Sequence, residues 1–491
     1  KEKFSLDAHI GASIKDNRFD ELSVYGPIAG APNIFNVVNL DKSQKKTPKT
    51  GWHEQTQSFF YSLELGWKSQ LFVTTTGRND WASQLANSPQ KSFFYPSVGV
   101  SWLPSSTFNF PEKFNYLKIR ASWASVANPF PRELTIATHP YDDTISGWDD
   151  KSNYPIGQLY PERTKTWELG FDARFLHGFT LSASWYRADT YNQTFNPNLS
   201  ASSGYSDIYI QTGHVRNTGV EASLGYDHQW KNWNWNSQFT FSWNKNKIIE
   251  LCKEWYNPIT EETITMNRLQ ISKLGRAKFI LKEGGSMGDL YSTTDLRRDD
   301  KGNIEIDEGG NVVVEDNLPD MKLGSVFPDY NLAWRNSVSW KNLNLGFLVT
   351  ARIGGIVNSL TQANMDLFGV SEATAAARDA GGALVNGRSL VNPETWYTAI
   401  ASQGGIPQYY TYSATNVRLQ ELSLGYTIPR KWLHNICSIT VSFVGRNLWM
   451  MYCKAPFDPE AVASTNNFYQ GMDYFMMPST RNLGFNINIK F

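Results

Sequence analysis

The last segment of the chain, residues 479–491, constrains the fold most strongly. Apolar side chains occupy every odd position from Leu483 to Phe491, and small or polar residues occupy the even positions between them. Side chains on a β-strand point alternately to opposite faces, so this segment has one apolar face and one polar face. A transmembrane β-barrel places such faces against lipid and a wet lumen. The edge strand of a soluble β-sandwich has the same period, so this segment alone leaves both folds open.

Composition narrows the class of protein. Basic and acidic residues number 46 each, so the formal net charge is zero and no electrostatic attraction to nucleic acid is indicated. The chain contains 18 Trp and 23 Tyr, residues that favour boundaries between water and an apolar phase. No apolar run approaches the roughly 18 residues of a transmembrane helix. A β-barrel stays compatible with this composition, because half of each strand faces inward and dilutes the hydropathy signal.

Strict alternation recurs along the whole chain and predicts about fourteen strands. Asp172 and Arg174 share the polar face of one such segment, and charged residues on a common face suit a water-filled lumen better than a packed sandwich core. Apolar residues change parity between Leu419 and Leu422, which predicts a β-bulge near Gln420. The clearest alternating segments are 166–175, 179–185, 220–227, 233–244 and 343–351.

Short and very long connections follow one another in regular alternation. Three tight turns have a Trp at the strand end and a Lys in the turn, as expected for an aromatic belt beside water. Loops as long as the intervening ones are rare in compact soluble domains. Short periplasmic turns and long extracellular loops are typical of outer-membrane barrels. The Trp-Lys turns are 67–69, 230–232 and 340–342, a fourth tight turn is 176–178, and the long loops are 14–54, 128–162, 246–327, 354–410 and 451–478.

Two loop motifs resemble functional sites. Residues 284–288 match the G-x-S-x-G pattern of hydrolases, in which the Ser lies on a sharp turn between a strand and a helix. No helical pattern follows Ser286, so we interpret the match as a chance occurrence. The acidic segments 299–303 and 307–311 have some character of a calcium loop, but Lys301 occupies a ligand position. We expect turns of a small β-hairpin there, with a bound cation as the alternative.

Histidine and cysteine give no sign of a cofactor. The seven His are scattered without a metal-binding spacing. Cys252, Cys437 and Cys453 do not form the even, dense set of a disulfide framework, and we interpret them as small apolar residues. We therefore expect no metal, no other cofactor and no catalysis.

Aromatic residues in the long loops are the remaining functional signal. Exposed rings beside Asn, Gln and Asp could stack on sugar rings or contact peptide side chains. Packing within the loops, or anchoring at the membrane surface, is the alternative for each single residue. The candidate substrate-binding residues are Trp148, Tyr154, Tyr160, Trp396, Tyr397, Tyr409, Tyr410, Tyr469 and Tyr474.

Several short segments, taken in order, resemble the C-terminal barrel portion of the SusC-like (RagA-like) TonB-dependent outer-membrane transporters of Bacteroidota. The resemblance covers nearly all 491 residues and depends on the order and spacing of the segments, because each one is short. The segments are TGRNDW at 76–81, YPSVGVSW at 95–102, LKIRASW at 117–123, ELG at 168–170, RNTGVE at 216–221, LG at 323–324, PDY at 328–330, LGYTIP at 424–429 and GRNL at 445–448.

The resemblance implies an all-β fold, a transmembrane antiparallel β-barrel of 22 strands of which this chain supplies about 14. In that family an N-terminal plug occludes the barrel, and a small β-sandwich extension and a TonB-contacting segment precede the plug. A SusD-like surface lipoprotein caps the barrel. The implied function is TonB-dependent import of an oligosaccharide or oligopeptide across the outer membrane.

We expect residues 1–491 to be the C-terminal part of that barrel, without the plug and the N-terminal extension. Lys1 leads directly into an alternating strand, with no initiator Met or signal peptide, which suggests a mature fragment or a piece of a longer chain. Unpaired strand edges are costly in lipid, so strands 4–12 and 483–491 should pair with the N-terminal portion of the same transporter. TonB would act through that portion. The other expected partners are the SusD-like lipoprotein and membrane lipid, but no nucleic acid.

Three other functions remain open at this point. A passive outer-membrane channel would need the fourteen strands to close on themselves. An outer-membrane enzyme barrel would need a catalytic Ser and His or an acid pair near its rim. A soluble lectin-like β protein would need no detergent for extraction.

Overall fold

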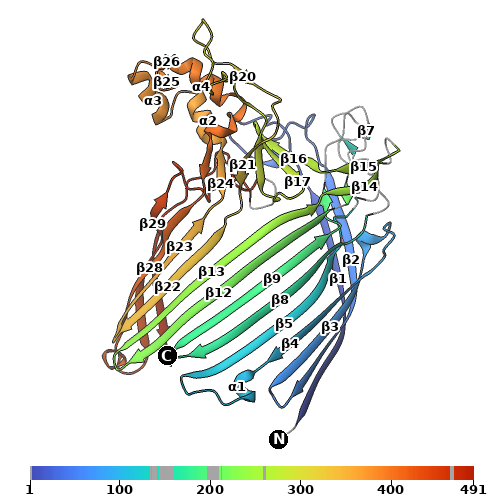
Figure 1. Ribbon diagram of the computed structural model, residues 1–491, viewed down its shortest axis with the longest axis vertical. Coiled ribbons are helices and arrows are strands. Elements are labelled where there is room, and N and C mark those ends of the chain that lie inside the picture. The colour runs from blue at the N-terminus through green and yellow to red at the C-terminus, as the bar shows by residue number, and fades with distance from the viewer. Residues whose placement is uncertain are drawn as a thin grey trace.

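One antiparallel sheet of 14 strands forms most of the protein in the computed structural model (Figure 1). The structure describes residues 3–132, 134, 141–142, 147–148, 159–195, 209–211, 213–257, 261–464 and 469–491. The strands of the sheet are ordered as in the chain, and the sheet curves into a tall wall. They are β1 (Phe4–Leu22), β2 (Lys49–Trp67), β3 (Leu71–Ala82), β4 (Phe93–Trp102), β5 (Phe114–Asn128), β8 (Glu162–Phe175), β9 (Phe179–Tyr191), β12 (His214–Trp230), β13 (Trp233–Glu250), β22 (Tyr330–Trp340), β23 (Leu343–Ile353), β28 (Asn416–Ile428), β29 (Ser438–Cys453) and β31 (Asn482–Lys490).

The strand count and the bulge predicted from the sequence are confirmed. Leu348 pairs with Glu421 and Val349 pairs with Leu419, so Gln420 is an extra residue in β28. The bulge restores the apolar face of β28 after the parity change, because one additional residue moves the following side chains to the opposite face.

The first hairpin is taller than the sequence predicted. The expected loop 14–54 is wrong at both ends, because β1 continues to Leu22 and β2 begins at Lys49. Polar cross-strand contacts extend this ladder, including one of 2.8 Å between His53 Nε2 and Asp16 Oδ1. Apolar alternation stops where neither face needs apolar residues, but the backbone ladder continues, so periodicity alone ends the strand too early.

An aromatic row follows the tight-turn end of the wall. Trp230 pairs with Trp233 across one turn, and Trp233 pairs with Trp340 of the neighbouring strand. The rings of Trp233 and Trp340 stack with centroids 5.6 Å apart, and the ammonium group of Lys341 lies 5.2 Å from the Trp340 ring centroid. Both chain ends lie at this end of the wall (Figure 1). Exposed Trp with flanking Lys is typical of a membrane–water boundary.

At the opposite end, the predicted long loops carry short helices and sheets of their own (Figure 1). Polar side chains cap the helices: Ser359, Ser371 and Asn392 each accept a hydrogen bond from a backbone N–H of the following turn. The helices are α1 (Pro104–Thr107) at the turn end, and α2 (Leu360–Leu367), α3 (Glu372–Asp379) and α4 (Pro393–Ala401) at the loop end. The loop strands are β6 (Tyr141–Asp142), β7 (Gly147–Trp148), β10 (Thr194–Phe195), β11 (Ile210–Gln211), β14 (Cys252–Asn257), β15 (Glu262–Met266), β16 (Arg268–Leu274), β17 (Ala277–Lys282), β18 (Asp289–Ser292), β19 (Asp295–Leu296), β20 (Val314–Glu315), β21 (Met321–Ser325), β24 (Ile356–Ser359), β25 (Ala383–Val385), β26 (Ser389–Val391), β27 (Thr411–Ser413) and β30 (Met472–Asp473).

Buried apolar residues gather in the loops, whereas the apolar face of the wall is open to its surroundings. One buried cluster joins Leu296 and Val312 of the loop after β13 to Ala363, Ile400 and other residues of the loop after β23. Because the sequence predicts an extracellular position for the long loops, we call this joint unit of helices α2–α4 and residues 295–315 the extracellular cap. On the wall, Trp167 and Leu169 are more than half exposed. An exposed apolar strand face of this kind is typical of the lipid-facing surface of a transmembrane barrel.

The sheet is open at both edges. In the part of the chain that the structure describes, β1 pairs only with β2 and β31 pairs only with β29. None of the described helices is long and apolar enough to cross a membrane.

Candidate functional site

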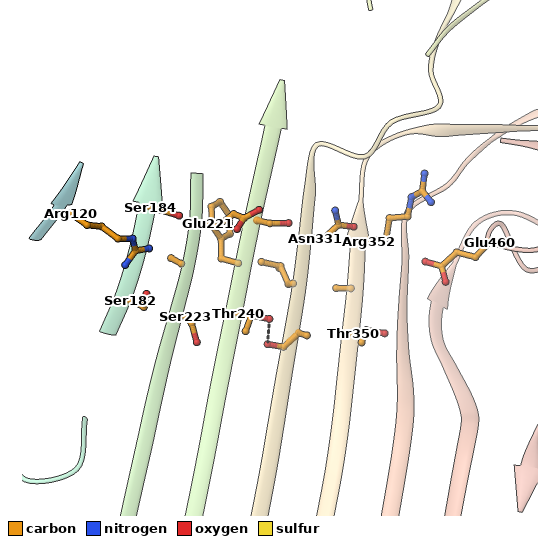
Figure 2. Close-up of a pocket in the computed structure, with 16 residues that line it drawn as sticks. Arg120, Ser182, Ser184, Glu221, Ser223, Thr240, Asn331, Thr350, Arg352 and Glu460 are labelled. Atoms are coloured by element: carbon orange, nitrogen blue, oxygen red, sulfur yellow. Dashed lines mark hydrogen bonds between the residues drawn. The ribbon is translucent and has the colours of Figure 1, made fainter. Parts of the chain in front are cut away.

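A polar pocket of about 560 Å³ lies on the inner face of the wall (Figure 2). Its polar side chains come from the faces of six strands that are opposite to the exposed apolar residues, and Glu460 comes from the loop after β29. On β13, for example, Thr240 and Ser242 alternate with Phe239, Phe241 and Trp243. The polar lining residues are Arg120, Ser182, Ser184, Glu221, Ser223, Thr240, Ser242, Asn331, Thr350, Arg352 and Glu460.

Both signs of charge occur in this pocket. On one side, Arg120 donates to Asp172 over 2.8 Å and lies 3.5 Å from Glu168. On the other side, Arg352 donates to the Val326 carbonyl over 2.7 Å, and its Nε has no hydrogen-bond partner among the described residues. Hydroxyl, amide and charged groups of both signs offer hydrogen bonds to a polar solute that carries little net charge.

A buried ion pair ties the last long loop to the wall beside this pocket. Arg418 of β28 contacts both carboxylate oxygens of Asp458 at 2.9 and 3.1 Å, and its Nη2 lies 3.1 Å from Glu460. The Arg418 and Asp458 side chains are 6% and 9% exposed. Burial, the largest single effect, would raise the pKa of Asp458. The hydrogen bonds from Arg418, the Glu460 backbone and Ser479, together with the Arg418 charge, outweigh it and hold that pKa below its ordinary value. Asp458 and Glu460 therefore have a fixed position at the rim.

Three of the predicted substrate-binding aromatics pack inside the extracellular cap. Trp396 and Tyr409 meet edge to face with ring centroids 5.9 Å apart. Tyr410 is 1% exposed, and its hydroxyl donates to Asp366 over 3.0 Å. Burial, and then the nearby Asp366 carboxylate, raise the pKa of Tyr410 far above its usual value, so the hydroxyl stays a neutral donor. Because Tyr410 is enclosed by protein, its ring offers no surface to a solute.

Tyr397 also packs against the buried core of this cap. It lines a pocket of about 440 Å³ together with Asp366, Arg378 and Asn392. The Asp366 carboxylate also accepts a 3.0 Å hydrogen bond from Gln362. An aromatic ring beside carboxylate, guanidinium and amide groups can bind either a sugar or a peptide.

The remaining predicted aromatics are distributed over separate loops. Tyr160, Tyr469 and Tyr474 are between 38% and 49% exposed. The backbone N–H and C=O groups of Tyr160 both bond to the side chain of Gln211. Trp148 belongs to β7, for which the structure describes the backbone pairing but not the side chain. Tyr154 lies outside the described residues.

The contacts of the G-x-S-x-G segment indicate a structural role. It connects strand β17 to strand β18, not a strand to a helix as the hydrolase elbow requires. The Ser286 hydroxyl lies 3.4 Å from Asn246 Oδ1 and 3.5 Å from Ser325 Oγ. Asn246 Oδ1 also accepts the Met287 N–H over 2.8 Å. The segment therefore docks the loop after β13 onto the end of that strand.

The two acidic segments form turns, as predicted. The Asp299 carboxylate accepts hydrogen bonds from the backbone N–H groups of Lys301 and Asn303, and Asp307 binds Asn311 in the same way. Backbone bridges join Arg298 to Ile304 and Ile306 to Val312. Across the described residues, no group of three His, Cys, Asp or Glu side chains is arranged to hold a metal ion. Cys437 and Cys453, which both belong to the described part, form no disulfide.

Sequence reasoning did not find Arg352, Arg418, Asp458 or Glu460. Arg418 and Asp458 lie 40 residues apart, and a charged residue in a strand gives no sign of its partner in a distant loop. The Asp458-Pro459-Glu460 segment is the only local signal, because two carboxylates so close together suggest a shared cationic partner.

The comparisons agree with this architecture. The family model described as "TonB dependent receptor-like, beta-barrel" matches residues 3–448. TonB-dependent receptor P3 of Formosa agariphila is 26% identical, over 99% of this chain and 51% of that protein. The TonB-dependent receptor SusC of Bacteroides thetaiotaomicron is 21% identical, over 76% of this chain and 38% of that protein. The chain thus spans about half the length, or less, of these relatives.

Solved structures share the fold. The RagAB peptide importer in its open-open state superposes with a TM-score of 0.78 at 18% identity, over 100% of this chain and 53% of that chain. Its closed-closed state gives a TM-score of 0.77 with 54% of that chain covered. Together with the family match over most of its length, this shows that the chain belongs to the TonB-dependent receptor-like β-barrel family and is similar to SusC and RagA.

Proposed function

We propose that this chain is the C-terminal wall and extracellular cap of a TonB-dependent outer-membrane importer. The observation that supports the proposal is the open sheet: among the described residues, β1 and β31 each have one unpaired edge, which a bilayer does not tolerate. The N-terminal portion of the same transporter would supply the missing strands and a plug in the lumen. TonB would act on that portion, and this chain would form the surface along which the solute moves.

The substrate class that we propose is a sizeable polar nutrient, an oligopeptide or an oligosaccharide. The mixed hydroxyl, amide and charged lining of the inner pocket supports this class. Tyr397, with Asp366 and Arg378 beside it, would give a first contact on the cap. The RagAB complex, which shares this fold, is a peptide importer, and this favours the oligopeptide. A SusD-like surface lipoprotein would deliver the solute to the cap.

Uptake by cells that express the full-length transporter tests the function. We expect a labelled mixture of oligopeptides or oligosaccharides to enter when TonB is active and to stay outside when TonB is inactivated. A passive channel, the main alternative, would admit the solute equally in both cases. An enzyme barrel would release modified solute without accumulation in the cell.

A photoreactive residue at Phe485 of β31 tests the architecture separately. We expect it to capture a segment of the transporter that lies outside residues 1–491. The same residue at Phe443 of β29, which already faces Phe485 across the sheet, should capture only β31 or β28. Capture of β1 by Phe485 would mean that the sheet closes on itself, and the proposal would then give way to the passive channel.

A further inference from the structure

A second, smaller pocket lies on the inner face of the wall, nearer the extracellular rim. It measures about 220 Å³ and is formed where Met287 and Phe327, from the loop after β13, approach the ends of β8, β9, β12 and β13. On β12 it contains Asn217, four residues above Glu221 of the larger pocket. At about 3.3 Å per residue the two pockets are about 13 Å apart along the same face. A solute that enters from outside therefore meets the smaller pocket first.

Three asparagine side chains form the back of this rim pocket and form hydrogen bonds with one another. Asn217 Oδ1 accepts hydrogen bonds from Asn244 Nδ2 at 3.3 Å and from Asn246 Nδ2 at 3.0 Å. Asn244 Oδ1 accepts from the Tyr186 hydroxyl at 3.2 Å, and Asn246 Oδ1 accepts from the backbone of Met287. All three amide oxygens are therefore occupied, and the amides act as a fixed frame.

Two hydrogen-bond acceptors in the pocket have no donor among the described residues. Glu162 lines the pocket and is partly buried, and its carboxylate has no hydrogen bond or ion pair within the described part of the chain. Gln193 Oε1 is buried without a hydrogen-bond partner. None of the described lining residues is cationic. An enclosed carboxylate without a counter-charge is unfavourable, and so is an enclosed carbonyl oxygen without a donor.

We propose that the rim pocket binds an alkylammonium group, with Glu162 as counter-ion and Gln193 Oε1 as a second acceptor. An ammonium group has three N–H donors and no acceptor, so it matches this surplus of acceptors. A sugar hydroxyl would supply a donor but would leave the carboxylate charge uncompensated. Met287 and Phe327 give the pocket an apolar side for the carbon chain next to the nitrogen.

For its biological role this inference rests on the proposed import function, because it narrows the solute to one with a free amine. The amine is either the N-terminus of a peptide or the side chain of a lysine. Binding to purified protein does not depend on TonB or on transport, so it can succeed or fail independently of the uptake experiment.

The test is calorimetric titration of the purified full-length transporter in detergent. The probes are trialanine amide with a free N-terminus, its N-acetylated form, and N-acetylated Ala-Lys-Ala amide. We expect the wild-type protein to bind at least one free-amine probe about tenfold or more tightly than the acetylated trialanine, as a charge-assisted hydrogen bond of this kind provides. Preference for the first or the third probe assigns the α-amine or the ε-amine.

Glu162→Gln should abolish that preference while leaving the weak binding of the acetylated probe unchanged. The matched control is Glu168→Gln, on the same strand and the same face, where the carboxylate already pairs with Arg120. The control should keep the wild-type preference. Equal binding of free and acetylated probes by the wild-type protein overturns the proposal. This comparison uses the wild-type protein alone, so it does not depend on whether a variant folds. A preference that survives in Glu162→Gln overturns it as well.

Discussion

Arg418 and Asp458 form a two-pronged buried ion pair that joins strand β28 to the last long loop. Removal of one partner leaves the other charge buried and uncompensated, which typically costs about 3–5 kcal/mol. We expect Arg418→Ala to release the loop 451–478, so that protease cleaves it at a lower temperature than in the wild type. Arg446→Ala is the control, because Arg446 of the neighbouring strand β29 is 67% exposed in its pair with Glu421. Such a pair contributes about 0–1 kcal/mol, and equal cleavage of the two variants would contradict a structural role for Arg418.

Acid should release the same loop. The folded pKa of Asp458 is lower than its ordinary value of about 3.9, so the folded protein favours the carboxylate. The stability from this group is fully present above that ordinary value and is lost as pH falls through the lower folded pKa. We expect protease resistance of the loop to be constant from neutral pH down to about 4 and to decline below it. In Arg418→Ala the same decline should be absent, which cleavage by an acid-active protease would reveal.

The two faces of β13 should differ in tolerance of charge. Phe239 lies on the lipid-facing side and is 41% exposed, whereas the Gln238 amide donates to Ser223 Oγ over 3.0 Å on the inner side. We expect Phe239→Arg to cost about 2–4 kcal/mol near the midplane and to reduce assembly into the membrane. Gln238→Arg should assemble normally. The fraction of protein that resists extraction with urea measures the difference, and equal fractions would argue against a barrel wall.

The tight-turn end of the wall, where the aromatic row lies, should face the periplasm. A cysteine introduced at Lys231, in the turn between Trp230 and Trp233, should not react with a membrane-impermeant maleimide on intact cells. A cysteine at Leu384, which is 65% exposed in the extracellular cap, should react readily. Permeabilised cells should show both reactions. Labelling of Lys231→Cys on intact cells would show that the tight turns face the outside, opposite to the orientation that we predict.

The strands of the wall could be predicted well because apolar and polar residues alternate along a barrel strand. This pattern is local and does not depend on residues that are distant in the sequence. Even the bulge at Gln420 was visible, since one extra residue changes the parity of everything after it. The 2.8 Å contact between Asp16 and His53 lies in the part that was missed, where the ladder continues without apolar alternation.

The extracellular cap could not be predicted from local patterns. Its core joins Leu296 to Ile400 across more than a hundred residues, and no periodicity links the two segments. Tyr410 looked like a surface aromatic beside polar residues, but the Asp366 carboxylate that receives its hydroxyl lies in another part of the loop. Glu162 and Gln193 gave no signal, because an unsatisfied acceptor is recognised only when all of its neighbours are known.

The two open edges also differ in height. β1 has nineteen residues and β31 has nine, so a direct seam between them would leave more than half of β1 without a ladder partner. In the barrel that we propose, a strand that pairs with all of β1 would be long and would rise above the membrane surface, whereas a neighbour for β31 could be short. The rim of the complete barrel would then be uneven. It would be high at the β1–β2 hairpin and low beside β31.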